Sequence, residues 1–127
     1  MGSPAEVAAF IDEVNSPFCK LNFDISHFDV QGYSTADSVT HLGPRTVHTH
    51  VKDQRGRVPK FDFLIPGEGD FDFVEYLLEM QKAGYDGYIS AEISMQVHRR
   101  PDYDPIAAAE VTYRTLTQAF AAAGIEH

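Results

Sequence analysis

Residues 45–53 read RTVHTHVKD, and the fold prediction starts from them. Its β-branched residues predict a strand over residues 45–51, and His48 and His50 point to one face of it because side chains alternate along a strand. Short apolar runs at residues 20–25 and 88–93 predict one strand before it and one after it. The connections between the three are long enough for helices, which favours parallel pairing.

Helical patterns fill the intervals between these strands. Ser3 and Glu6 form a capping-box pattern around Pro4, and the helix that they open is ended by Asn-Ser-Pro at residues 15–17. Further helices are expected at residues 34–42, from Asp70 or Asp72 to Gly84, and at residues 105–122. This alternation predicts an α/β fold with parallel strands, which is compatible with a barrel or a doubly wound sheet.

The segment from residue 52 to residue 69 fits neither pattern. It is rich in charge and glycine, so we predict a loop without strands. Within it, Asp53 could orient a metal ligand or pair with Arg55. The turn at residues 66–69, Pro-Gly-Glu-Gly, looks superficially like a phosphate cradle, but Glu68 would oppose an anion there. We interpret it as a turn that leads into the next helix.

Composition limits the classes of partner. The 127 residues suffice for one domain, and nineteen Asp and Glu against ten Lys and Arg give a formal charge of −9, which disfavours nucleic acid. The single cysteine, Cys19, fits a reducing compartment. No apolar run approaches the length of a membrane span, and the first twenty residues do not resemble a signal peptide. We expect a cytoplasmic protein with no membrane or nucleic-acid partner.

Each predicted strand carries one potential metal ligand near its end: Asp24, His50 and Glu92. The carboxyl ends of parallel strands meet at the edge of the sheet where α/β proteins place ligands. A carboxylate such as Glu92 in an apolar strand is costly to bury unless a cation or another partner compensates it. Two carboxylates and one imidazole suit Mn²⁺, Mg²⁺, Co²⁺ or Zn²⁺.

These ligands have plainer interpretations too. Asp24 could cap the next segment or pair with Lys52. His50 could be a hydrogen-bonded histidine in the interior, which is the usual state of a lone histidine. His48 fits packing, or a hydrogen bond to a ligand, better than ligation.

Four motifs occur in this order: NFDISH at residues 22–27, VHTHVKD at 47–53, PGEGDFDF at 66–73 and GYDGYISAE at 84–92. Together they resemble the sugar phosphate isomerases and epimerases of the xylose isomerase-like TIM barrel superfamily. The resemblance implies an eight-stranded (β/α)8 barrel with one divalent metal, often Mn²⁺, at the carboxyl-end rim. It also implies four ligands from the last four strands, of which Asp24, His50 and Glu92 match the second, third and fourth.

The first ligand of the family, a Glu, has no counterpart in this sequence. We therefore expect residues 1–127 to be a single partial domain, the C-terminal portion of the barrel, with about three βα units, a leading helix and no N-terminal strands. An open portion leaves strand edges bare and, we expect, uncovers the inner faces of Leu21, Phe23, Val47 and Ile89. This predicts a homo-oligomer.

The resemblance implies a reaction on a sugar or sugar phosphate, with proton transfer beside a carbonyl through an enediolate. Glu92 would serve as ligand and base, and His27 would contact a substrate oxygen and assist catalysis. Arg55 or Arg57 would bind a distal hydroxyl or phosphate. The chain alone is expected to be inactive without the missing Glu. The alternatives are a non-catalytic, oligomeric half-barrel that binds ligands and, less well supported, a metal hydrolase like the apurinic endonucleases.

Overall fold

The computed structural model describes residues 2–126. Its main sheet has the order β1-β2-β5, with β2 (Thr46–Val51) between β1 (Leu21–Asp24) and β5 (Ile89–Ala91). Both pairings are parallel, as predicted. Within residues 2–126, the outer edges of β1 and β5 pair with no further strand.

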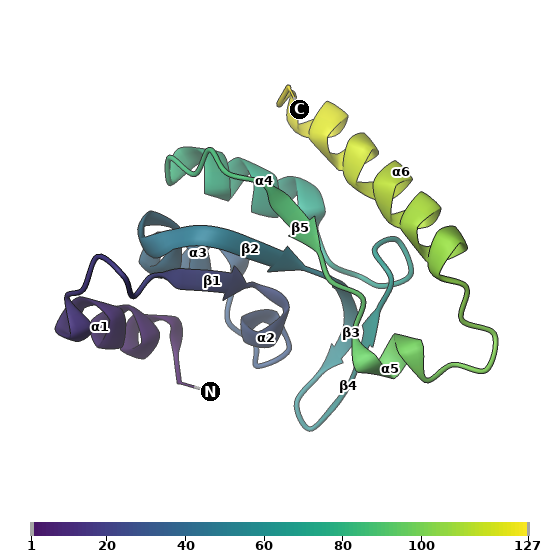
Figure 1. The fold of residues 1–127 in the computed structure, drawn as a ribbon, viewed down its shortest axis with the longest axis horizontal. Coiled ribbons are helices and arrows are strands. Elements are labelled where there is room, and N and C mark those ends of the chain that lie inside the picture. The colour runs from purple at the N-terminus through teal and green to yellow at the C-terminus, as the bar shows by residue number, and fades with distance from the viewer. Residues whose placement is uncertain (1, 127) are drawn as a thin grey trace.

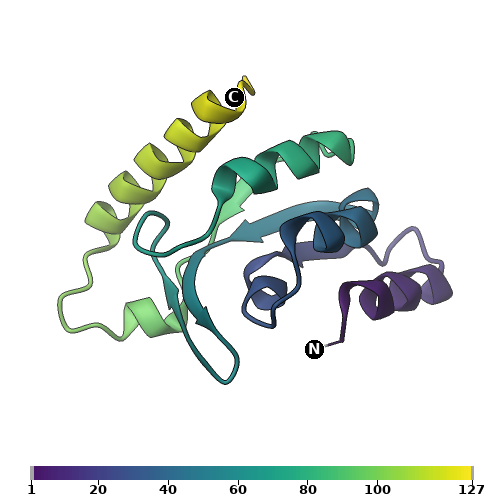
Figure 2. The same ribbon diagram turned by 180° about the vertical axis from the view of Figure 1, so that it is seen from behind.

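The long helices lie on one side of this sheet. Figures 1 and 2 show α3 (Thr35–Leu42) and α4 (Phe73–Lys82) behind the strands, α1 (Pro4–Val14) below β1 and next to α3, and α6 (Pro105–Ala123) beyond α4. Two of these helices start where the sequence predicts. Ser3 and Glu6 form the expected capping box of α1. The Asp72 carboxylate caps α4 by accepting from the Glu75 amide at 2.9 Å. A 3₁₀ turn, η1 (Gly43–Arg45), leads from α3 into β2.

The two faces of the sheet differ in chemistry. Phe23 and Val51 are fully buried in the core on the helix side, where the Phe23 ring lies 6.2 Å from that of Tyr76. Alternation puts Asn22, Asp24, His48 and His50 on the opposite face, which no helix covers in Figure 1. That open face is therefore polar.

This arrangement corrects the expectation of an uncovered apolar inner face. Phe23 points to the helices, and Leu21 and Ile89 are partly buried against the same core. Only Val47 of the four is exposed, at 62%. The apolar side chains of the strands face the helices, and the polar side chains face the open side. This is the reverse of the expectation, because alternate residues of a strand point to opposite faces.

A second sheet contradicts the predicted loop. β3 (Asp53–Arg57) and β4 (Lys60–Leu64) form an antiparallel hairpin beyond the ends of β1 and β2 (Figure 1). Gly56 has φ +80°, and a Cβ there would lie 2.6 Å from the Lys60 carbonyl oxygen. β3 reads DQRGR and has no apolar residue, so it lacks the alternation by which sequence analysis detects a strand. β4 does alternate, with half-buried Phe61 and Phe63 between exposed Lys60 and Asp62, but without a recognisable partner strand.

Two single-turn helices also escaped prediction. They are α2 (Ser26–Asp29), directly after β1, and α5 (Met95–His98), after β5. Among the described residues, no helix combines the length and the hydropathy needed to cross a membrane.

Candidate metal centre

The three predicted ligands meet at the carboxyl ends of the parallel strands. Asp24 is the last residue of β1 and lies opposite His50 of β2 in the ladder. Glu92 follows β5, and its amide donates to the Val51 carbonyl at 2.8 Å, which places it beside the end of β2. One ligand atom from each of the three side chains lies within 4.8 Å of the other two. The structure thus brings this predicted group together.

Lys52 lies inside the same group. Its side chain is only 2% exposed, and Nζ is 2.6 Å from Asp24 Oδ2 and 2.5 Å from Glu92 Oε2. The ammonium also lies 5.2 Å from the centre of the Phe63 ring, on the β4 strand of the hairpin. One cation therefore bridges the two carboxylates and is shielded from water by the hairpin.

Asp24 also caps the segment that follows it and pairs with Lys52, the two plainer roles considered for it. Its Oδ1 accepts from the Ser26 amide at 3.1 Å and from the Ser26 hydroxyl at 2.6 Å, so it holds the start of α2. Its Oδ2 binds Lys52. These hydrogen bonds fix the orientation of the carboxylate, which is half-buried, toward the open face of the sheet.

Two histidines lie against the acids. His50 Nδ1 is 3.4 Å from Glu92 Oε2, and His27 Nε2 is 3.4 Å from Asp24 Oδ2. His27 belongs to α2, and its ring packs edge-on against Phe63 at 5.2 Å. His48 is exposed and stacks edge-on with His50, also at 5.2 Å, so it supports the ring of His50.

Comparison with known proteins places this geometry in a family. Residues 1–116 match the family model described as the xylose isomerase-like TIM barrel. The chain belongs to this family. Its three parallel strands and their helices are thus part of a (β/α)8 barrel.

Relatives of the chain include sugar epimerases. It is 30% identical to an L-ribulose 3-epimerase of Methylomonas sp. (strain DH-1) over 93 residues, which are 72% of this chain and 30% of the relative. It is 27% identical to a D-psicose 3-epimerase of Enterocloster bolteae over 82 residues, 65% of this chain and 25% of the relative.

A solved structure agrees along nearly the whole chain. The xylose isomerase domain protein of Alicyclobacillus acidocaldarius subsp. acidocaldarius superimposes with a TM-score of 0.78 at 27% identity, covering 96% of this chain and 44% of that one. The chain thus spans less than half of the solved relative and about a third or less of the curated ones.

Arg55 and Arg57, which were predicted to bind substrate, contact other parts of the chain. Arg55 donates to the Glu68 carbonyl at 2.5 Å, and its Nε lies 3.4 Å from Asp70 Oδ2. Arg57 bonds the carbonyl oxygen of Asp29 in α2, the helix that carries His27. Both arginine side chains are 58% exposed, so either could still turn toward a ligand.

Asp53 plays neither of the roles considered for it. Its carboxylate is buried and accepts four backbone N–H groups, at distances of 2.8 to 3.1 Å, from Gln54, Gly67, Gly69 and Phe71. These bonds use the amides that a phosphate cradle would need, which supports the interpretation of residues 66–69 as a turn. A Cβ at Gly69 would lie 2.2 Å from Asp53 Oδ1.

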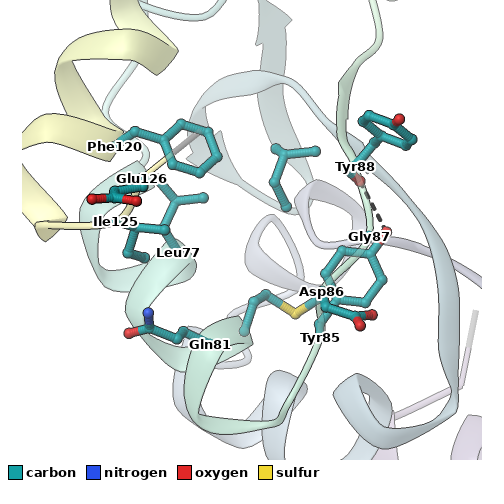
Figure 3. A pocket seen from close by; sticks show the side chains of 11 residues that line it. Leu77, Gln81, Tyr85, Asp86, Gly87, Tyr88, Phe120, Ile125 and Glu126 are labelled. Carbon is teal, nitrogen blue, oxygen red and sulfur yellow. Dashed lines mark hydrogen bonds between the residues drawn. The ribbon is translucent and has the colours of Figure 1, made fainter.

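A hollow of about 610 Å³ lies at the other end of the sheet, between α4, β5 and the end of α6 (Figure 3). Its walls include Leu77 and Phe120, and Tyr85 donates from its hydroxyl to the Tyr88 carbonyl at 2.9 Å. The hollow adjoins the amino end of β5, whereas Glu92 follows the carboxyl end. It is thus separate from the metal-ligand group.

Proposed function

We propose that Asp24, His50 and Glu92 are three ligands of a divalent metal centre in a sugar or sugar phosphate isomerase or epimerase. The observation that carries the proposal is the convergence of the three side chains within 4.8 Å at neighbouring strand ends. The epimerases among the relatives support the reaction class. The carboxyl-end rim is also where barrels of this kind carry their chemistry.

The donor set fits a hard or borderline divalent ion. Two ligand atoms about 2.0–2.2 Å from one ion lie at most about 4.4 Å apart, so rotation of the side chains suffices to bring the three atoms to one ion. Oxygen and imidazole donors without a thiolate suit Mn²⁺, Mg²⁺, Co²⁺ or Zn²⁺, and we propose Mn²⁺.

The bound metal would polarise the carbonyl and hydroxyl oxygens of a ketose and stabilise the enediolate charge. Glu92 would take or return the proton of the carbon beside the carbonyl on one face of the sugar, because it is the more exposed of the two carboxylates, at 40% against 14% for Asp24. His27, beside Asp24, would hydrogen-bond a substrate oxygen. Arg55 or Arg57 would bind the distal hydroxyl or phosphate.

For residues 1–127 alone we propose metal binding without turnover. The resemblance assigns the base for the opposite face of the sugar to a Glu that has no counterpart in this sequence. Incubation with Mn²⁺ and L-ribulose or D-psicose in deuterated water, followed by proton NMR, tests this. Epimer formation at the rate of an ordinary enzyme would refute it.

The metal centre is tested by calorimetry with Mn²⁺ alone. We expect His50→Ala and Glu92→Gln each to abolish measurable binding, since each removes a ligand from a set of three. His98→Ala and Glu110→Gln, which change exposed residues of the same types, serve as matched controls and should bind like the unmodified protein. Unchanged affinity in both ligand variants would remove the proposal.

One observation favours a non-catalytic alternative. Lys52 already compensates both acids, so the group is satisfied without a metal. In that case the centre would be a structural ion pair in a binding protein. Calorimetry of the unmodified protein separates the two, because a structural ion pair predicts no Mn²⁺ binding.

A further inference from the structure

Lys52 has surroundings that differ from those of an ordinary surface lysine. Its side chain is 2% exposed, and its ammonium bonds Asp24 Oδ2 at 2.6 Å and Glu92 Oε2 at 2.5 Å. The next residue, Asp53, is bonded to backbone amides and turns away from this group. Lys52 is thus the cation between the two acids that we propose as metal ligands.

The contacts of the ammonium compete directly with a metal. Asp24 Oδ1 already accepts two hydrogen bonds from Ser26, so Oδ2 is the oxygen left for a metal. Oδ2 is also the atom that accepts from Lys52. A divalent ion at this point would lie within a few ångströms of a positive charge in a site screened from water, where repulsion is strong. The ion and the ammonium therefore compete for Asp24 Oδ2 and Glu92 Oε2.

We propose that Lys52 is a built-in counter-ion, which holds Asp24 and Glu92 together before the metal binds and which the metal must displace. This role rests on the proposed metal centre. Lys52 is a positioning residue: it preorganises the two carboxylates and lowers the affinity for the metal. The site thereby stays folded and charge-compensated when the metal is absent.

The role predicts opposite effects of one substitution on affinity and on stability. In Lys52→Met, Mn²⁺ no longer displaces an ammonium, and we expect its Kd to fall at least about tenfold. Without metal, two neighbouring carboxylates lose their cation, so the melting temperature should fall by roughly 3–8 °C. Saturating Mn²⁺ should restore it to the value of the unmodified protein with Mn²⁺, or above.

The experiment measures Mn²⁺ affinity by calorimetry and thermal unfolding with and without Mn²⁺. Lys52→Gln is a second neutral variant in case the Met variant does not fold, and Lys52→Arg keeps the charge and should retain an affinity near the original. Lys82→Met is the matched control: it removes a lysine that is 68% exposed and paired with Glu79 on α4. It should leave Mn²⁺ affinity unchanged.

The outcomes separate this role from the metal centre itself. If the unmodified protein binds Mn²⁺ and His50→Ala does not, but Lys52→Met binds equally or more weakly, the counter-ion role is wrong and the centre stands. If neither the unmodified protein nor any Lys52 variant binds Mn²⁺, the metal centre is wrong, and the counter-ion role falls with it.

Discussion

At the scale of single residues, Asp53 carries the strongest structural prediction. Its buried carboxylate accepts four backbone N–H groups, three of them from residues 67–71. In Asp53→Asn, the side-chain NH₂ group would face backbone N–H groups, which are also donors, and the negative charge would be lost. We expect a loss of about 2–4 kcal/mol in the free energy of unfolding, measured in urea.

The control for this change is Asp62→Asn, an exposed residue on β4 of the same hairpin. Its stability should stay within about 0.5 kcal/mol of the original. Equal stabilities of Asp53→Asn and Asp62→Asn would show that the turn at residues 66–69 does not depend on the carboxylate.

Individual residues were predictable where their role follows from a strand end. Asp24, His50 and Glu92 each stand near the end of a predicted strand, so parallel pairing alone brings them to one edge. Lys52 was considered only as a partner of Asp24, because its contact with Glu92 depends on the neighbouring strand. The role of Asp53 depends on how residues 67–71 fold back, which no local pattern shows.

At the scale of elements, an ion pair with a predictable pH dependence ties α1 to η1, the turn directly before β2. Arg45 donates to Asp12 through Nε at 2.8 Å and Nη2 at 2.5 Å. The hydrogen bond from Arg45 lowers the pKa of the Asp12 carboxyl. A carboxyl whose pKa is lower in the folded state stabilises it above the unfolded pKa, about 3.9, and this contribution is lost as pH falls through the folded value.

Arg45→Met should therefore raise the pKa of Asp12 toward its ordinary value, as followed by NMR titration. The stability difference from the unmodified protein should be largest at neutral pH and shrink in acid, where the loss of the hydrogen bond from Arg45 to the His41 carbonyl remains. Salt at 1 M should shrink it, because the pair is exposed. Arg114→Met, at an exposed position on α6, should leave the titration of Asp12 unaltered, and an unaltered titration in Arg45→Met as well would disprove the coupling.

Elements with an apolar stripe or run were predicted within a few residues of their bounds. Helix α4, which Asp72 caps, has four buried side chains at helical spacing, and this makes its pattern plain. The β3–β4 hairpin was missed because β3 has no apolar residue and its two buried side chains, Asp53 and Gln54, are polar. Phe61 and Phe63 do alternate in β4, but a single short alternating run without a partner strand does not predict a hairpin.

At the scale of the whole molecule, the sheet has a covered apolar face and an open polar face. Asn22, Asp24, His48 and His50 alternate with the buried residues of β1 and β2. Self-association through an apolar inner face, the reason first given for an oligomer, is therefore not supported. What remains is the pair of strand edges, on β1 and β5, that have no strand partner within residues 2–126.

We still expect the 127-residue chain to self-associate, now through these edges, because unpaired backbone groups of a strand edge invite pairing with another copy. The edge at β5 is the more apolar: Tyr88, 88% exposed, precedes Ile89 beside the hollow in Figure 3. A lysine at this position should oppose pairing. Sedimentation velocity at micromolar concentration should therefore shift Tyr88→Lys toward the monomer, compared with the unmodified chain.

Tyr113→Lys provides the control, because Tyr113 is 72% exposed on α6 and distant in sequence from either edge. It should sediment like the unmodified chain, since it adds the same charge without blocking a strand. If both variants shifted equally, the loss of an exposed tyrosine, rather than the blocking of a strand edge, would be the cause. A monomer at micromolar concentration in all three proteins would contradict the expected self-association.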